Sequence, residues 1–201
     1  TQTICYNTAP SQIATTVNAT GGVGSYTYTW ESSLDDSSWS TISGATLVSY
    51  QPAALTQTTY FRKKTTDSSC GFAYSNTVTV TVRQNFSVGV IGNPQNICYN
   101  TAPALLDNTT APSGGAGSFT YQWESSTDNV NFFIISGQTA ATYQAGALTQ
   151  TTYYRRKVTD ASCGNGYTNT VTITVKPNFS IGTIGTNQTV CFNSAPTLID
   201  N

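Results

Sequence analysis

The sequence predicts an all-β protein built from tandem β-sandwich modules, and two observations carry this prediction. The first is a repeat: sliding residues 1–93 onto residues 94–186 needs no gap and leaves 53 positions identical. The second is the pattern within each copy, where short alternating segments are separated by Gly, Asn, Ser and Asp turns without helical periodicity. About seven strands in about 93 residues have the size and rhythm of a β-sandwich.

A period this regular indicates an array of autonomous modules. We expect module 1 at residues 1–85 (its first strand could be incomplete), module 2 at residues 86–178 and the start of a truncated third module at residues 179–201. The phrase "TVCFNSAP" near the end repeats "TICYNTAP" near the start. The chain is therefore expected to be a slice of a longer string of modules. The linker "RQNFSVGVIGNPQ" is partly apolar and is expected to pack between modules rather than swing freely.

Three strands stand out in each module. "SYTYTW" places Tyr26, Tyr28 and Trp30 against small polar residues, and "SFTYQW" repeats this pattern in module 2. "TTYFRKKTT" and its counterpart "TTYYRRKVT" are rich in β-forming residues and are further strand candidates. "NTVTVTV" puts valines on one face and threonines on the other, which predicts a half-buried strand.

These features support a resemblance. Trp30 on the third strand, and Leu55 shortly before Tyr60 at a strand start, resemble immunoglobulin-like and fibronectin type III modules, the second feature resembling their tyrosine corner. The string "YQWESSTDNVNF…ISG…Y…ALTQTTYYRRKVTDASCG…TNTVTITV" further resembles the Ig-like repeats of giant surface adhesins of the Bacteroidota. The resemblance covers both complete modules. It implies export by the type IX system, an extracellular or cell-surface location, and a part in attachment or gliding motility.

The five cysteines of this extracellular-looking β protein suggest disulfides. We predict that the bridges lie within modules, joining Cys5 to Cys70 and Cys98 to Cys163. The partner of Cys191 is expected beyond residue 201. The rival bridge, Cys70–Cys98, would link neighbouring modules. A strand between them carries the chain roughly 25–30 Å away at about 3.3 Å per residue, whereas a bridge needs Cα atoms within about 7 Å. Metal binding is not expected, because the chain has no CxxC pair and no His.

Composition argues against several function classes. Only 8% of residues are charged and the net charge is −1, so no basic excess points to nucleic acid. No apolar run approaches the roughly 18 residues of a membrane span. Without His, the usual Ser triad or Cys–His pair cannot be assembled, and the carboxylate Asp36 becomes Asn129 in the second copy. We therefore expect no enzymatic activity and no cofactor.

Two features leave a functional interpretation open. "LDDSSW" and "TDNVNF" could form a Ca²⁺ loop, although a hairpin turn explains Asp and Asn there equally well and is preferred. Basic residues beside aromatics and Glu could form a groove for an acidic polysaccharide, or they could simply pair across strands. The candidate ligand face comprises Tyr28, Glu31, Arg62, Lys64, Tyr121, Glu124, Arg155 and Lys157.

The function that the sequence favours is a structural stalk or fibre of a secreted or cell-surface adhesin, built from disulfide-locked Ig-like repeats. The alternative is a carbohydrate-binding, lectin-like module that uses the aromatic and basic strands. The expected partners are neighbouring repeats of the same chain, together with surface glycans or other cells.

Overall fold

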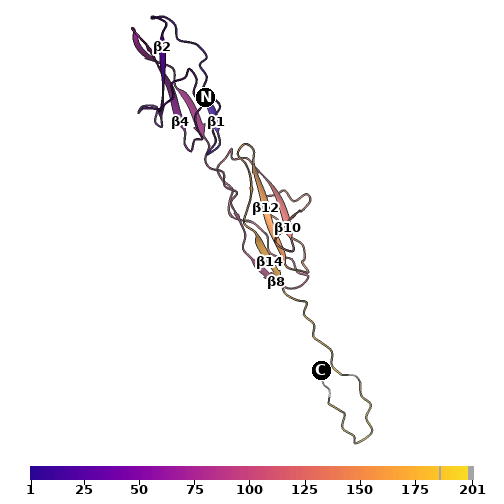
Figure 1. Ribbon diagram of the computed structural model, residues 1–201. Coiled ribbons are helices and arrows are strands. Elements are labelled where there is room, and N and C mark those ends of the chain that lie inside the picture. The colour runs from indigo at the N-terminus through magenta and orange to yellow at the C-terminus, as the bar shows by residue number, and fades with distance from the viewer. Residues whose placement is uncertain (186, 199–201) are drawn as a thin grey trace.

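The structure is a computed structural model that describes residues 1–185 and 187–198. Within these residues every regular element is a β-strand, and the strands form two similar modules that lie end to end (Figure 1). The all-β fold predicted from the sequence is confirmed. We keep residues 1–85, 86–178 and 179–201 as our proposed division of the chain.

The main sheet of module 1 has the order β1-β6-β4-β2-β3, with β5 paired to β4 beyond the end of β6. The first strand is parallel to β6, and the other pairs are antiparallel. The strands are β1 (Gln2–Ile4), β2 (Tyr26–Ser33), β3 (Ser40–Thr41), β4 (Thr59–Asp67), β5 (Gly71–Tyr74) and β6 (Val78–Val82).

Module 2 repeats this sheet one period later, in the order β8-β14-β12-β10-β11 with β13 paired to β12. It adds a two-stranded sheet of β7 and β9. The strands are β7 (Val90–Ile91), β8 (Gln95–Ile97), β9 (Asn108–Thr110), β10 (Phe119–Ser126), β11 (Phe133–Ile134), β12 (Thr152–Asp160), β13 (Gly164–Tyr167) and β14 (Val171–Val175).

A second layer of irregular chain covers one face of each main sheet. In module 1 it is held by isolated bridges, such as the one between Ile13 and Tyr50. The core lies between the layers, where the ring of Tyr50 packs against Trp30 and Phe61 with centroids 5.7 and 5.8 Å apart. Because side chains alternate along a strand, Trp30 and Phe61 face this core while their neighbours face outward. The inward Trp expected from the sequence is therefore buried, at 3% exposed.

The apolar linker is packed rather than swinging freely, but its apolar residues pack into module 2 and not between the modules as expected. Phe86 stacks on Phe119 with ring centroids 5.9 Å apart. Ile91 is fully buried in the core of module 2, against residues that include Leu106 and Trp123. The segment after Phe86 is therefore the first strand of module 2, which fixes the chain's entry into that module.

Candidate functional site at the module junction

A disulfide joins the two modules. Cys5 follows β1, and its sulfur is bonded to Cys163, which lies in the turn between β12 and β13, with Cα atoms 5.5 Å apart. The predicted pairing within modules was wrong, both for Cys5–Cys70 and for Cys98–Cys163. Cys70, Cys98 and Cys191 are free and exposed.

The strand order explains why Cys5 does not bond to Cys70. In module 1, β1 runs parallel to β6 and ends where β6 ends, at the pole that faces module 2. β4 is antiparallel to β6, so its last residues and the following turn with Cys70 lie at the other pole. The nine residues of β4 separate the poles by roughly 30 Å at about 3.3 Å per residue. The sequence did not reveal that β1 pairs with β6 in parallel, and the disulfide prediction was wrong for this reason.

The carboxylate of Asp160 shapes the turn that carries Cys163. It accepts backbone N–H bonds from Ser162 and Cys163 at 3.0 and 2.7 Å, and from Ala116 and Gly117 at 2.8 and 3.2 Å. Burial raises the pKa of Asp160, but these four bonds outweigh it and the net pKa is lowered. The disulfide turn is thus fixed to the loop that precedes β10.

The linker provides a second attachment between the modules. The carbonyl oxygen of Gln84 accepts a bond from the N–H of Gly115 at 2.9 Å. Just after the boundary, Ser87 and Ser113 of module 2 exchange two backbone bonds at 2.9 and 3.0 Å, which hold the next part of the linker in place. The disulfide and the Gln84–Gly115 bond therefore join the modules at two separate places, which restrains both bending and rotation.

The two arginines of the proposed ligand face, Arg62 and Arg155, are engaged in salt bridges. Arg62 binds Glu31 at 2.7 Å, and its guanidinium lies 4.2 Å from the ring centroid of Trp39 and 3.9 Å from that of Tyr74. The arrangement is a salt bridge enclosed by two aromatic rings.

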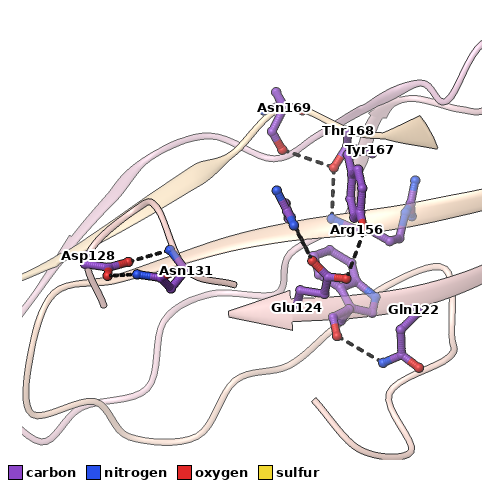
Figure 2. Close-up of polar contacts among 10 residues, drawn as sticks. Gln122, Glu124, Asp128, Asn131, Arg156, Tyr167, Thr168 and Asn169 are labelled. Carbon is purple, nitrogen blue, oxygen red and sulfur yellow. Dashed lines mark hydrogen bonds and ion pairs between the residues drawn. The ribbon is translucent and has the colours of Figure 1, made fainter. Parts of the chain in front are cut away.

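Module 2 repeats this cluster with one change. Arg155 binds Glu124 at 2.7 Å and lies 4.0 Å from the rings of both Phe132 and Tyr167. The hydroxyl of Tyr167 also donates to Glu124 at 3.3 Å, as Figure 2 shows. Phe132 takes the place of Trp39 without loss of the stack.

The eight proposed residues do not share one face. Glu31, Arg62 and Lys64 lie on the outer side of the sheet, where Lys64 stands 4.0 Å from the ring centroid of Phe72. Tyr28 lies on the inner side, where the amine of Lys63 is 4.8 Å from its ring centroid. In module 2 the strand alternation gives the same division, with Glu124, Arg155 and Lys157 outside and Tyr121 inside. Ligand binding by these residues stays a prediction.

Each module has a buried cation that the sequence analysis did not single out. Arg156 is fully buried and donates to the side-chain oxygen of Asn108 at 2.6 Å and to the carbonyl of Ala141. Lys63 stands at the same place in module 1 and donates to the hydroxyl of Thr15 at 2.5 Å. Burial lowers the pKa of both cations. They connect the main sheet to the second layer through hydrogen bonds across the interior.

The two Asp-containing loops are hairpin turns. Asp128 accepts backbone bonds from Val130 and Asn131 at 2.9 and 2.8 Å, and a side-chain bond from Asn131 at 2.7 Å (Figure 2). These bonds hold the pKa of Asp128 well below its usual range, and Asp35 behaves alike in module 1. The oxygens that could have bound Ca²⁺ thus serve the turn. Among the described residues there is no cluster of three or more His, Cys, Asp or Glu side chains suited to a metal ion.

Two β-sandwich modules of one strand order, placed end to end, define this chain as a tandem immunoglobulin-like protein. Residues 1–84 and 87–177 each match the family described as "Domain of unknown function (DUF8696)", and the chain belongs to this family. No curated protein matches it. In the part of the chain that the structure describes, no helix is long and apolar enough to cross a membrane.

Several solved structures are similar to the chain at low sequence identity. The chain is similar to a variant of titin domains I67–I69 (12% identity, 87% of this chain and 62% of that one, TM-score 0.48). It is similar to extracellular domains 3–5 of Drosophila OTK (13%, 87% and 59%, TM-score 0.47). It is also similar to fibronectin(III)-like modules of Clostridium thermocellum CbhA (14%, 88% and 90%, TM-score 0.36). The chain spans about three fifths of the length of the first two.

Proposed function

We propose that this chain is a section of the stalk of a secreted or cell-surface adhesin, of the type IX-exported kind that its sequence resembles. Its task is to hold an adhesive part away from the cell surface in attachment or gliding. The observation that supports this most strongly is the disulfide between Cys5 and Cys163, because it joins consecutive modules. A covalent bond between two modules fixes how they are oriented relative to each other. It does not stabilise the fold of a single module.

The repeat extends this proposal to a longer array. Cys98 stands in module 2 where Cys5 stands in module 1, and Cys70 stands in module 1 where Cys163 stands in module 2. In a longer array, each module would bond to its neighbours on both sides through the same sequence separation of 158 residues. A stalk whose junctions are all locked in this way transmits position and orientation over many modules.

Small-angle X-ray scattering of the 201-residue chain tests the proposal. We expect an elongated particle in the oxidised protein and a wider spread of module orientations after reduction or in the variant Cys5→Ser. Cys191→Ser is the matched control, because that cysteine is free, and it should leave the scattering unchanged. A compact, side-by-side pair of modules in the oxidised protein would contradict the stalk.

A further inference from the structure

One edge of the main sheet of module 2 is apolar. β11 is the last strand at this edge, next to β10. It lies in a run of four apolar residues, 132–135. Phe133 and Ile134 are 71% and 67% exposed, and Val130 in the preceding turn is 76% exposed. Natural proteins usually protect such an edge with charge, proline or covering chain, so an apolar edge indicates a contact with another molecule.

The same edge of module 1, at β3, is polar. The three exposed apolar residues of module 2 have hydroxyl residues as their counterparts one period earlier, namely Ser37, Ser40 and Thr41. These hydroxyl residues are exposed although module 2 follows module 1 directly. A following module therefore does not cover this edge. The apolar residues of module 2 face sideways from the array and not toward its next module.

The backbone of β11 is able to accept a further strand. The N–H of Ile135 donates to the carbonyl of Trp123 in β10 at 2.9 Å. The N–H and C=O groups of successive residues point to opposite sides of a strand, so those of Ile134 point to the open edge. This residue offers one donor and one acceptor to a neighbouring strand.

The apolar side chains of β11 lie on both faces of the sheet. Ile134 is opposite Glu124, whose carboxylate binds Arg155 on the outer face. Phe133 is the next residue along the strand, so its side chain lies on the other face. A strand that is apolar on both faces is typical of a position inside a sheet, where both faces are covered.

Charge does not keep two copies of this edge apart. Residues 129–151 contain no Asp, Glu, Lys, Arg or Pro. The carboxylate of Asp128 accepts bonds from Val130 and Asn131 within its own turn. The net charge of the chain is −1, so the long-range repulsion between copies is weak. A second copy of the same strand therefore meets no opposing charge at this edge.

The exposed apolar area fits a weak contact. At their printed exposures Val130, Phe133 and Ile134 offer on the order of 400 Å² per copy, or about 800 Å² for two copies. A stable complex of two different proteins buries roughly 1,200 Å² or more. The edge is therefore too small to hold a single partner firmly, and it suits a contact that is made many times between copies.

We propose that β11 pairs with β11 of a second copy of this chain, antiparallel and about a two-fold axis. Ile134 of each copy lies opposite Ile134 of the other, and the two residues exchange N–H···O=C bonds. The main sheets of the two modules then form one continuous sheet. The Ile134 side chains meet on its outer face, and Phe133 of each copy covers the joined strands on the other face.

The direction of β11 sets the orientation of the two stalks. β10 begins at Phe119, which stacks on Phe86 near module 1, and it runs toward the opposite pole. β11 is antiparallel to β10, so it also lies along the array. Copies that join through antiparallel β11 strands therefore point in opposite directions.

Oppositely directed stalks are those that reach out from two facing cells. This inference rests on the proposed stalk function and deepens it: the partner of the stalk is the same stalk on another cell. Each contact is weak, and many contacts between two facing surfaces add up through avidity.

The experiment measures self-association of the 201-residue chain by sedimentation equilibrium. Cys70, Cys98 and Cys191 are capped with iodoacetamide, so that no disulfide forms between copies. We expect a monomer–dimer equilibrium with a Kd between roughly 10⁻⁵ and 10⁻³ M. In small-angle scattering the dimer should be longer than the monomer by one module, because the copies overlap at module 2 only. A dimer of monomer length would be a parallel, side-by-side pair and would overturn the proposal.

Module 1 provides matched variants. Phe133→Ser with Ile134→Thr gives the edge of module 2 the residues of module 1, which form the same fold. This double variant should weaken association by more than roughly tenfold, because two apolar side chains are lost from each copy. The reverse exchange, Ser40→Phe with Thr41→Ile, should give the chain a second edge of this kind and produce assemblies larger than dimers.

Leu34→Thr is the control, because Leu34 is an exposed apolar residue (59%) outside β3 whose counterpart in module 2 is Thr127. It should leave association unchanged. Beads that carry the chain through an N-terminal tag should clump, and beads that carry the Phe133→Ser, Ile134→Thr variant should not.

Two results overturn the inference: a chain that stays monomeric at about 1 mM, and association that the exchange at Phe133 and Ile134 does not weaken. Neither result affects the stalk function, since the Cys5–Cys163 bond and the elongated shape of the single chain are measured at low concentration.

Discussion

Arg156 donates a hydrogen bond across the interior of module 2 to the side-chain oxygen of Asn108, at 2.6 Å. We expect Arg156→Ala to lower the free energy of unfolding of module 2 by about 3 kcal/mol, because the bond and the packing of the Arg stem are both lost. Urea unfolding followed by the fluorescence of Trp123 measures this. The exchange Lys63→Arg with Thr15→Asn, which copies the arrangement of module 2 into module 1, is the control. A double variant that fails to fold would refute the view that the two cations are equivalent.

Mass spectrometry of peptides from the unreduced protein should show Cys5 joined to Cys163. A peptide that joins Cys5 to Cys70 would instead require β1 to leave its place beside β6. Reduction should lower the melting temperature of either module only slightly, because the bridge ties the modules to each other. A large loss of stability in module 1 alone would argue that the bridge lies within the module.

A double-mutant cycle on Arg155 and Glu124 tests the salt bridge on the outer face. We expect a coupling energy of about 1 kcal/mol, because the pair is partly exposed and gains from the two aromatic rings. Tyr167→Phe should reduce the coupling, since the Tyr hydroxyl donates to the same carboxylate. A coupling near zero would mean that the arginine is available to other partners, and the single variant Arg155→Ala should then be tested for glycan binding.

The turn carboxylates predict how stability depends on pH. The folded-state pKa of Asp128 is lowered by bonds from Asn131 and Val130. Its contribution to stability is therefore complete above the unfolded-state pKa of about 3.9 and is lost as pH falls through the lower folded-state pKa. NMR titration should show this carboxylate still ionised below pH 3.9, while Asp128→Asn should be less stable at neutral pH and less sensitive to acid. An ordinary titration midpoint for Asp128 would rule out this account of the turn.

The elements of the main sheets could be predicted because they rest on local alternation. Trp30 and its period-2 neighbours identify β2, and the valines of β6 identify another strand of the same sheet. The pairing of Cys5 could not be predicted in the same way, since it depends on which pole of the sheet each strand end reaches. That in turn depends on the parallel contact of β1 with β6, a relation between distant segments that no local pattern encodes.

The orientation of the candidate ligand residues also depends on contacts between distant segments, which a local sequence pattern does not encode. The register of β2 and β4 decides that Arg62 meets Glu31 while Lys63 meets Trp30. Adjacent residues on one strand therefore take opposite roles, one on the outer face and one in the interior. The sequence shows a run of three cations, and only the register separates them.

The disulfide between Cys5 and Cys163 has a consequence for how the chain carries tension. Because this bond closes a covalent ring, a pull on Thr1 passes through β1 to Cys5, crosses the two sulfurs and continues from Cys163. The chain between them lies off this path and cannot be drawn out, although it spans a separation of 158 residues, or about 500 Å when fully extended. Reduction of a single bond would release that length. The redox state of the surroundings would therefore decide whether the protein is a short, stiff tether or a longer, extensible one.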